Sequence, residues 1–209
     1  MTLEAELARG LDALHLPLVD AIQHKLLDYV ALVQKWNRVY NLTAVRDPER
    51  MLTHHVLDSL AVVPHLAGSR IVDVGSGAGL PGIPIAVALP QSRVTLLESN
   101  HKKSTFLNQA AIELGLNNIH VENSRAEAWR PESFFDVVIS RAFSELGEFI
   151  AAAAHLRAPD GVLMAMKGVY PYDELNQIPD GYRVQGVTPL SVPGLAAERH
   201  LVRIEAVKR

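Results

Sequence analysis

The sequence predicts an α/β fold in which helices alternate with the strands of a doubly wound, mostly parallel sheet. Two features indicate this class. From residue 70 onward, short apolar runs alternate with stretches of helical length. The first run, 71–74, leads directly into the glycine-rich segment 75–82, and a strand that enters a helix through a glycine turn is typical of nucleotide-binding sheets. The predicted architecture is therefore Rossmann-like.

Five apolar runs are expected to form the parallel part of the sheet, at 71–74, 93–97, 119–121, 137–139 and 161–166. Helices are expected near 82–89, 101–115 and 144–156. Runs this short and apolar are typical of a parallel sheet that is covered on both faces. The runs 182–192 and 199–207 have no helix between them and are separated by a Pro-Gly turn, which predicts an antiparallel pair at the edge of the sheet.

Residues 1–66 are predicted to form a helical cap packed on the core, and residues 67–209 the main ligand-binding domain. Apolar residues recur at steps of three and four from Leu18 to Trp36, and the helical stretch is expected to begin near Pro17. Asp47 followed by Pro48 predicts the start of a further helix, because Asp caps helices and Pro suits their first position. The whole region is expected to be helical to about residue 66.

The composition excludes several kinds of site. The chain has 209 residues and no Cys, so disulfides, thiolate zinc sites and cysteine nucleophiles are excluded. The N-terminus is acidic, and no apolar stretch reaches the ~18 residues that span a bilayer, so we expect a soluble cytoplasmic protein with no membrane partner. The formal net charge of −3 means that any contact with nucleic acid would need a local basic patch.

The glycine-rich segment offers two possible ligands. Gly77, Gly79 and Gly82 fit the dinucleotide pattern G-x-G-x-x-G, which alone is a weak signal. Asp73 precedes the glycines, and Glu98 ends the next strand, 23 residues after Gly75, where a carboxylate can accept hydrogen bonds from ribose hydroxyls. An acid ahead of the glycines suits the cationic methionine end of S-adenosylmethionine better than a pyrophosphate. The arrangement favours the methyl donor over NAD.

Two further segments follow predicted strands at the same edge of the sheet. Residues 124–127 follow the third strand, where the adenine of a ligand lying across the sheet would arrive. Arg141 follows the buried strand 137–139 and needs a partner, which is a ligand carboxylate, a phosphate or a neighbouring acid. Loops at strand ends carry the chemistry of α/β folds, so Arg141 is a candidate site residue.

Six segments of the chain resemble one protein family. They are Trp36–Thr43, His54–Ser59, Asp73–Gly82, Ser140–Phe143, Lys167–Gly168 and Glu198–His200. Together they closely resemble the bacterial small-subunit ribosomal RNA guanine-N7 methyltransferases, the glucose-inhibited division protein B family, from about residue 20 to the C-terminus. The resemblance implies a class I methyltransferase fold, S-adenosylmethionine as donor and one guanine of 16S rRNA as acceptor.

The resemblance also implies a set of site residues. The family's cofactor contacts fall on Gly75, Leu80, Ala126, Glu127 and Arg141, with Glu98 at the ribose position; with the turn residues, the expected cofactor site is Asp73, Gly75, Gly77, Gly79, Leu80, Glu98, Ala126, Glu127 and Arg141. Guanine N7 carries a lone pair and no proton, so no general base or covalent intermediate is expected. Arg141, Asn41 and His55 are candidates for positioning the reactants.

The expected partner is 16S rRNA or the small ribosomal subunit, bound by a monomer. Candidate RNA contacts are Lys102, Lys103, Arg125, Lys167 and Arg199. No metal site is expected, because adjacent histidines at 54 and 55 point to different faces of a helix. Three alternatives stay open at this point: a methyltransferase acting on a small molecule, an NAD-dependent oxidoreductase, and an RNA-binding protein without catalytic activity.

Overall fold

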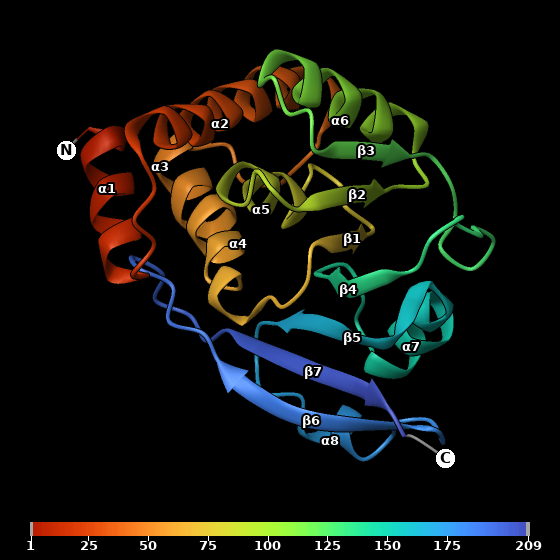
Figure 1. Cartoon of the computed structure of the whole chain (residues 1–209). Coiled ribbons are helices and arrows are strands. Elements are labelled where there is room, and N and C mark those ends of the chain that lie inside the picture. The colour runs from red at the N-terminus through yellow and green to blue at the C-terminus, as the bar shows by residue number, and fades with distance from the viewer. Residues whose placement is uncertain (1, 208–209) are drawn as a thin grey trace.

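In a computed structural model that describes residues 2–207, the strands form a single seven-stranded sheet of order β3-β2-β1-β4-β5-β7-β6 (Figure 1). The strands are β1(Arg70–Val74), β2(Arg93–Leu97), β3(Ile119–Glu122), β4(Phe135–Ser140), β5(Arg157–Lys167), β6(Tyr182–Pro189) and β7(His200–Ala206). β1 pairs in parallel with both β2 and β4. The chain therefore changes direction across the sheet beside β1, which places the switch point of a doubly wound fold at the end of this strand.

The antiparallel edge pair predicted for the C-terminal part is confirmed. β7 pairs antiparallel with β5, with Lys167 opposite His200, and β6 pairs antiparallel with β7. β6 ends at Pro189, three residues before the expected end at 192. Figure 1 shows this pair at the edge of the sheet opposite β3.

The N-terminal helices are interrupted more often than the sequence predicted. α1(Leu3–Ala13), α2(Asp20–Tyr40), α3(Pro48–Met51) and α4(Asp58–Leu60) are separated by the non-helical segments 14–19 and 41–47 and by a π-helix, Leu52–Leu57. α2 begins three residues after the expected Pro17. The predicted start at Asp47 is confirmed, because its side chain accepts a hydrogen bond from the Arg50 N–H at 2.9 Å and Pro48 opens α3.

The remaining helices are α5(Gly82–Ala88), α6(His101–Glu113), α7(Leu146–Ala153) and α8(Tyr172–Leu175). Side chains alternate between the two faces of each strand. Ile71, Val94 and Val137 pack in one apolar layer with α2, α5 and α6, while Val72 and Val138 pack in the other with α7. Figure 1 shows α2 and α6 side by side at the β3 edge.

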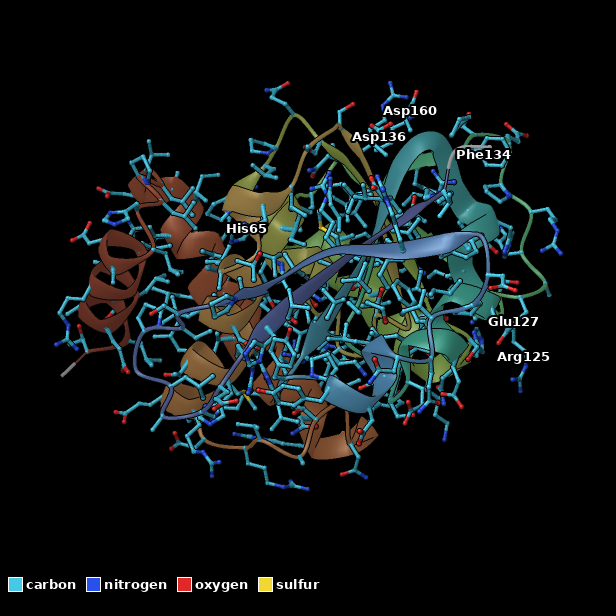
Figure 2. All side chains as sticks on the ribbon, turned by 90° about the horizontal axis from the view of Figure 1, so that it is seen from below. His65, Arg125, Glu127, Phe134, Asp136 and Asp160 are labelled. Carbon is cyan, nitrogen blue, oxygen red and sulfur yellow. The ribbon has the colours of Figure 1, made fainter. Side chains whose placement is uncertain are left out.

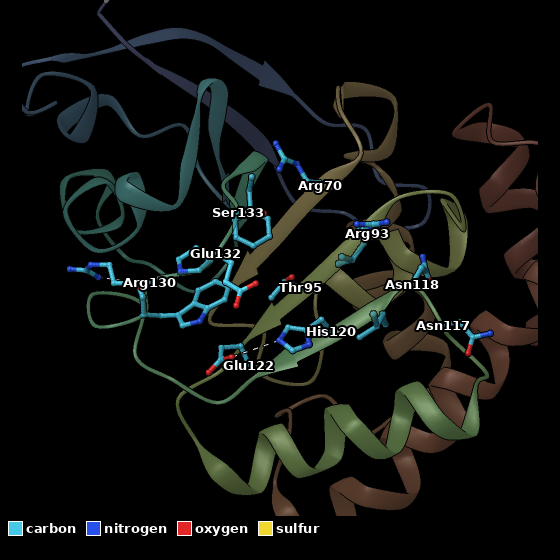
Figure 3. A pocket seen from close by; sticks show the side chains of 15 residues that line it. Arg70, Arg93, Thr95, Asn117, Asn118, His120, Glu122, Arg130, Glu132 and Ser133 are labelled. Atoms are coloured by element: carbon cyan, nitrogen blue, oxygen red, sulfur yellow. Dashed lines mark hydrogen bonds and ion pairs between the residues drawn. The ribbon is translucent and has the colours of Figure 1, made fainter.

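The expectation that helices cover both faces of the sheet is wrong over β2 and β3. Segment 123–134, which joins β3 to β4, contains no helix, so one face of these strands opens onto a groove of about 670 Å³ (Figure 3). Thr95, His120 and Glu122 line it. The alternation of apolar and polar residues in Ile119-His120-Val121-Glu122 is the sequence signal for this half-exposed strand.

The N-terminal helices and the sheet share one continuous apolar core, which includes Leu11 of α1, Leu26 of α2 and Leu96 of β2. The division of the chain at residue 66 stays a prediction. None of the helices within residues 2–207 combines the length and apolar character that a membrane crossing requires.

Candidate active site

The turn after β1 is held close to the ends of the neighbouring strands. Gly75 and Gly77 have φ values of +74° and +60°, a region that L side chains rarely adopt. A Cβ atom on Gly75 would lie 2.8 Å from Cβ of Ala142, which follows β4. The N–H groups of Gly75 and Ser76 donate to the carbonyl of Leu97 at the end of β2, at 2.8 and 3.2 Å. Glycine is thus required where this turn passes between β2 and β4.

Two buried carboxylates brace the same turn. Asp73 is fully buried, and its Oδ2 accepts a hydrogen bond from the N–H of Gly82 at 2.9 Å, where α5 begins. Burial raises the pKa of Asp73 to about 7, opposed by the hydrogen bond from Gly82. Glu98 Oε2 accepts from the N–H of Gly77 and Oε1 from the N–H of Asn100, each at 2.8 Å. Asp73 therefore supports the turn from inside the protein, while Glu98 holds its outer part.

A cavity of about 180 Å³ lies where this turn meets the end of β4 and the segment after α2. It is lined by Leu42, Thr43, Gly75, Ser76, Gly77, Ala78, Leu80, Arg141 and Ala142. Four predicted cofactor residues, Gly75, Gly77, Leu80 and Arg141, thus meet at one place. Gly79 is not part of this lining. Glycine is needed there because φ is +91°, and a Cβ would also lie 2.4 Å from Ile83 Cδ1 of α5.

Arg141 has a neighbouring acid as its partner. Its Nη1 donates to Asp58 Oδ2 at 3.0 Å and to the carbonyl of His54 at 3.2 Å. Asp58, only 1% exposed, also accepts at Oδ1 from Nε of Arg199, at 2.9 Å. One buried carboxylate in the N-terminal helices therefore holds two arginines, from the ends of β4 and β7. The network fixes the position of Arg141 at the cavity wall.

Comparison with known proteins decides the family. The family model for GidB, rRNA small subunit methyltransferase G, matches residues 22–202. The chain belongs to this family. A ribosomal RNA small subunit methyltransferase G from Nitrosospira multiformis is 57% identical over 204 residues, which cover 94% of each protein. The resemblance seen in the six sequence segments is confirmed over nearly the full chain.

Solved structures support the fold assignment. A SAM-dependent methyltransferase from Aquifex aeolicus superposes with a TM-score of 0.60 at 19% identity, over 76% of this chain and 93% of that one. A SAM-dependent methyltransferase from Thiobacillus denitrificans, in complex with S-adenosyl-L-homocysteine, superposes with a TM-score of 0.53 at 12% identity, over 84% and 97%. The predicted methyltransferase fold is confirmed.

The five cations predicted to contact RNA fall into two groups, those with a carboxylate partner within the chain and those without one among the described ion pairs. Lys167 is 9% exposed, and its Nζ pairs with Glu174 at 2.7 Å and donates to the carbonyl of Ser144. Arg199 is held by Asp58. Each of these two cations therefore has a carboxylate partner within the chain, and their contact with RNA stays a prediction. Lys102 and Arg125 are exposed and Lys103 is half-buried.

The predicted adenine segment lies on the surface. Figure 2 shows Arg125 and Glu127 close together at the edge of the molecule. Both side chains are exposed, and Ala126 between them is half-buried against the apolar layer that contains Phe149. This segment and the cavity follow the carboxyl ends of β3 and β1, which lie at the same edge of the sheet.

The two other positioning candidates differ in their surroundings. His55 lies in the π-helix, is 8% exposed, and its Nε2 is 2.8 Å from Oγ1 of Thr43. Burial, reinforced by the nearby charge of Arg141, lowers the pKa of His55 to about 4, so the ring is neutral at pH 7. Asn41 is the C-cap that follows α2, with φ +48°, and its exposed side chain accepts a hydrogen bond from Arg46 at 3.4 Å. Asn41 is not among the residues that line the cavity.

Two residues of the site were not assigned a specific role from sequence. Thr43 lines the cavity and contacts His55, and Asp58 holds Arg141 and Arg199. Both stand in segments that resemble the family, but their partners are between 12 and 141 residues away in the chain. No local pattern signals such contacts. Within residues 2–207, His, Asp and Glu side chains form no group of three that could hold a metal ion.

The larger groove over β2 and β3 contains none of the predicted site residues. Several of its charges are satisfied within the chain. Arg70 pairs with Asp136 at 3.5 Å. His120 Nε2 lies 3.7 Å from Glu122 Oε2, a contact that Figure 3 marks with a dashed line. Arg130 Nη1 donates to two backbone carbonyls, of Glu127 and Trp129. Asp136 therefore offsets the charge of Arg70, whereas the carbonyl groups hold the guanidinium of Arg130 in place without removing its charge.

Proposed function

We propose that this chain transfers a methyl group from S-adenosylmethionine to N7 of one guanine in 16S rRNA. Membership of the small-subunit rRNA methyltransferase family carries the proposal. The cavity supports it, because the glycine turn after β1 and Arg141 after β4 meet there. This is the edge of the sheet at which doubly wound folds bind their ligands.

The residues present fit the methyl donor. Each oxygen of Glu98 accepts one backbone N–H, and a carboxylate oxygen has a second lone pair, so Glu98 retains capacity for both ribose hydroxyls. Arg141 uses Nη1 for Asp58 and His54 and retains other N–H groups for the donor's carboxylate. Ala126 and Glu127 would contact the adenine. Asp73 would act indirectly, by holding Gly82 and thus the turn.

The proposed reaction requires the protein to position the reactants and does not require it to transfer a proton. S-adenosylmethionine supplies an electrophilic methyl group on a sulfonium. The lone pair of guanine N7 forms the new N–C bond as the S–C bond breaks, so a neutral thioether leaves and the positive charge moves to the base. No proton is removed, so no strong base is needed; this agrees with the low pKa of His55, which makes it a weak base, and with Asp73 being buried beneath the turn. Orientation of reactants is worth up to about 7–11 kcal/mol.

The proposed acceptor is 16S rRNA or the assembled small subunit, bound by a monomer in the cytoplasm. Lys102, Lys103 and Arg125 would contact phosphates, because they are the members of the predicted basic set without a carboxylate partner among the described ion pairs. With a net charge of −3, the chain would bind RNA through this local set.

Incubation with methyl-labelled S-adenosylmethionine tests the function. Small subunits and 16S rRNA from cells that lack the enzyme should each be offered, followed by mapping of the label. We expect label at N7 of one guanine in at least one of the two substrates. Absence of label in both, or label at a base position other than N7, would contradict the proposal. Tight binding of NADH but not of S-adenosylhomocysteine would favour the oxidoreductase instead.

A further inference from the structure

Thr43 is a polar residue of the cavity wall whose backbone is held by a buried side chain. Its backbone N–H donates to Oδ1 of Asn37 at 3.0 Å, and its carbonyl accepts from Nδ2 of the same side chain at 2.9 Å. Asn37 is itself buried, with 3% exposure, on α2. The two bonds fix the Thr43 backbone in the segment between α2 and α3. The hydroxyl group therefore has a defined position beside Arg141 and Gly75.

The oxygen of this hydroxyl has two neighbours in the protein. The N–H of Val45 donates to Oγ1 at 3.1 Å. Nε2 of His55 lies 2.8 Å from Oγ1. The direction of this second bond depends on which ring nitrogen of His55 carries the proton.

The surroundings of His55 decide between the two tautomers. Nδ1 is buried and makes no well-aligned hydrogen bond within residues 2–207, although the backbone carbonyl of His54 interacts with the ring and raises the pKa of His55 slightly against the effect of burial. A proton on Nδ1 would leave a buried N–H donor without a well-aligned acceptor, which is rarer in proteins than an acceptor without a donor. The proton therefore belongs on Nε2, which donates to Thr43. Oγ1 then accepts two hydrogen bonds, and both of its lone pairs are used.

With both lone pairs of Oγ1 in use, the remaining hydrogen-bonding group of Thr43 is its hydroxyl proton. Because its oxygen accepts from Val45 and His55, the hydroxyl donates to none of the described protein groups. Thr43 lines the cavity in which the reactants of the proposed function would meet. We propose that Thr43 donates this proton to an oxygen of a bound reactant, and that Asn37 and His55 are positioning residues that aim it there.

The inference rests on the proposed function, which supplies two acceptor oxygens of the same chemistry. One is a carboxylate oxygen of the methionine end of the donor. The other is O6 of the guanine, whose use would help select guanine while N7 stays free for the methyl group. In both cases one hydroxyl contributes to binding without taking part in proton transfer.

Substitution of Thr43 tests this inference. T43V keeps the shape of the side chain and removes the hydroxyl, while T43S keeps the hydroxyl. We expect T43V to lower kcat/KM for RNA methylation by roughly 10-fold or more, and T43S to stay within about 3-fold of the wild type. T105V is the matched control, since Thr105 is exposed on α6 and its hydroxyl donates to the carbonyl of His101 at 2.8 Å. Thermal unfolding of each variant checks that it folds.

Analogues that lack one acceptor identify the oxygen and separate a donor role from a structural one. With 2-aminopurine in place of the target guanine, O6 is absent, and the penalty of T43V should disappear if Thr43 binds O6. If Thr43 binds the carboxylate, T43V should weaken binding of S-adenosylhomocysteine by roughly 10-fold, but not binding of its decarboxylated analogue. A T43V penalty that is equal for every analogue, or no penalty at all, would overturn the inference.

The tautomer provides a readout that needs no catalysis. Nitrogen NMR of the ring of His55 in the wild-type protein should report a neutral imidazole with the proton on Nε2. A proton on Nδ1 would overturn the inference, because the Thr43 hydroxyl would then donate its proton to Nε2 of His55 and not to a reactant. If no RNA is methylated, the function proposed above fails, while the tautomer and the binding of S-adenosylhomocysteine still test the role of Thr43.

Discussion

Asp58 and Arg141 form a buried ion pair, with 3.0 Å between Oδ2 and Nη1, that joins the N-terminal helices to the wall of the cavity. The second oxygen of Asp58 binds Arg199, which precedes β7. Three segments that are distant in the chain therefore meet at one carboxylate. The arginine of the candidate site is positioned by the helices that precede the sheet, so these helices are part of the active-site structure as well as of the core.

Replacement of Asp58 should affect both stability and donor binding. D58N leaves two partly buried guanidinium groups without a negative partner, and we expect unfolding to become easier by about 3–5 kcal/mol. Binding of S-adenosylhomocysteine should also weaken, because Arg141 loses its fixed orientation. Urea unfolding and calorimetry measure the two effects.

E205Q is the matched control for Asp58. Glu205 pairs with Arg183, whose side chain is 69% exposed, so its loss should change stability by less than about 1 kcal/mol. A D58N protein as stable as E205Q would show that the buried network contributes little.

Asp73 should make stability depend on pH in the direction opposite to that of a salt-bridged acid. Its folded pKa of about 7 lies above the ordinary value of 3.8, so the folded state holds a proton that the unfolded state releases between these values. Stability should therefore fall as the pH rises from about 4 to 7. D73N should remove this dependence on pH, and its free energy of unfolding should rise relative to that of the wild type by a few kcal/mol across that range. Urea unfolding at pH 4.5, 6 and 8 measures it; parallel curves for both proteins would contradict the burial argument.

Much of the fold is predictable from sequence because it depends on local periodicity. The strands around Val72, Leu96 and Val138 are apolar runs bounded by turns. The glycines at 75 and 77 predict the positive φ angles of the turn after β1. The resemblance also identifies the family, because six segments that match together are far more specific than a single glycine pattern. For the site, these features predict only the course of the backbone.

The unpredicted features depend on contacts between distant segments. Lys167 and Arg199 look like free cations in sequence, and only the folded chain brings Glu174 and Asp58 to them. The π-helix at 52–57 follows no residue pattern, yet it carries His55 to Thr43. The open face over His120 reflects the absence of a helix in segment 123–134, and the only sequence signal for it is the alternation of apolar and polar residues within β3.

Glu98 should contribute to donor binding through both of its oxygens. E98A removes the acceptors for Gly77 and Asn100 as well as those offered to the ribose. We expect binding of S-adenosylhomocysteine to weaken by roughly 10- to 100-fold, the range for loss of hydrogen bonds to a charged group. E113Q is the control, because Glu113 accepts from Gln109 on the exposed side of α6. Equal affinities for E98A and E113Q would exclude Glu98 from the site.

The exposed cations should affect RNA binding and leave donor binding unchanged. K102A and R125A should each lower the affinity for 16S rRNA and reduce the salt dependence of binding by about one unit of slope, since each removes one phosphate contact. R183A is the control, as Arg183 is also an exposed arginine, on the edge strand β6, and already pairs with Glu205. K167A should instead lower stability, because Glu174 would lose its buried partner. Filter binding across a series of salt concentrations separates these outcomes, and an unchanged salt slope for both K102A and R125A would place the RNA on another face of the protein.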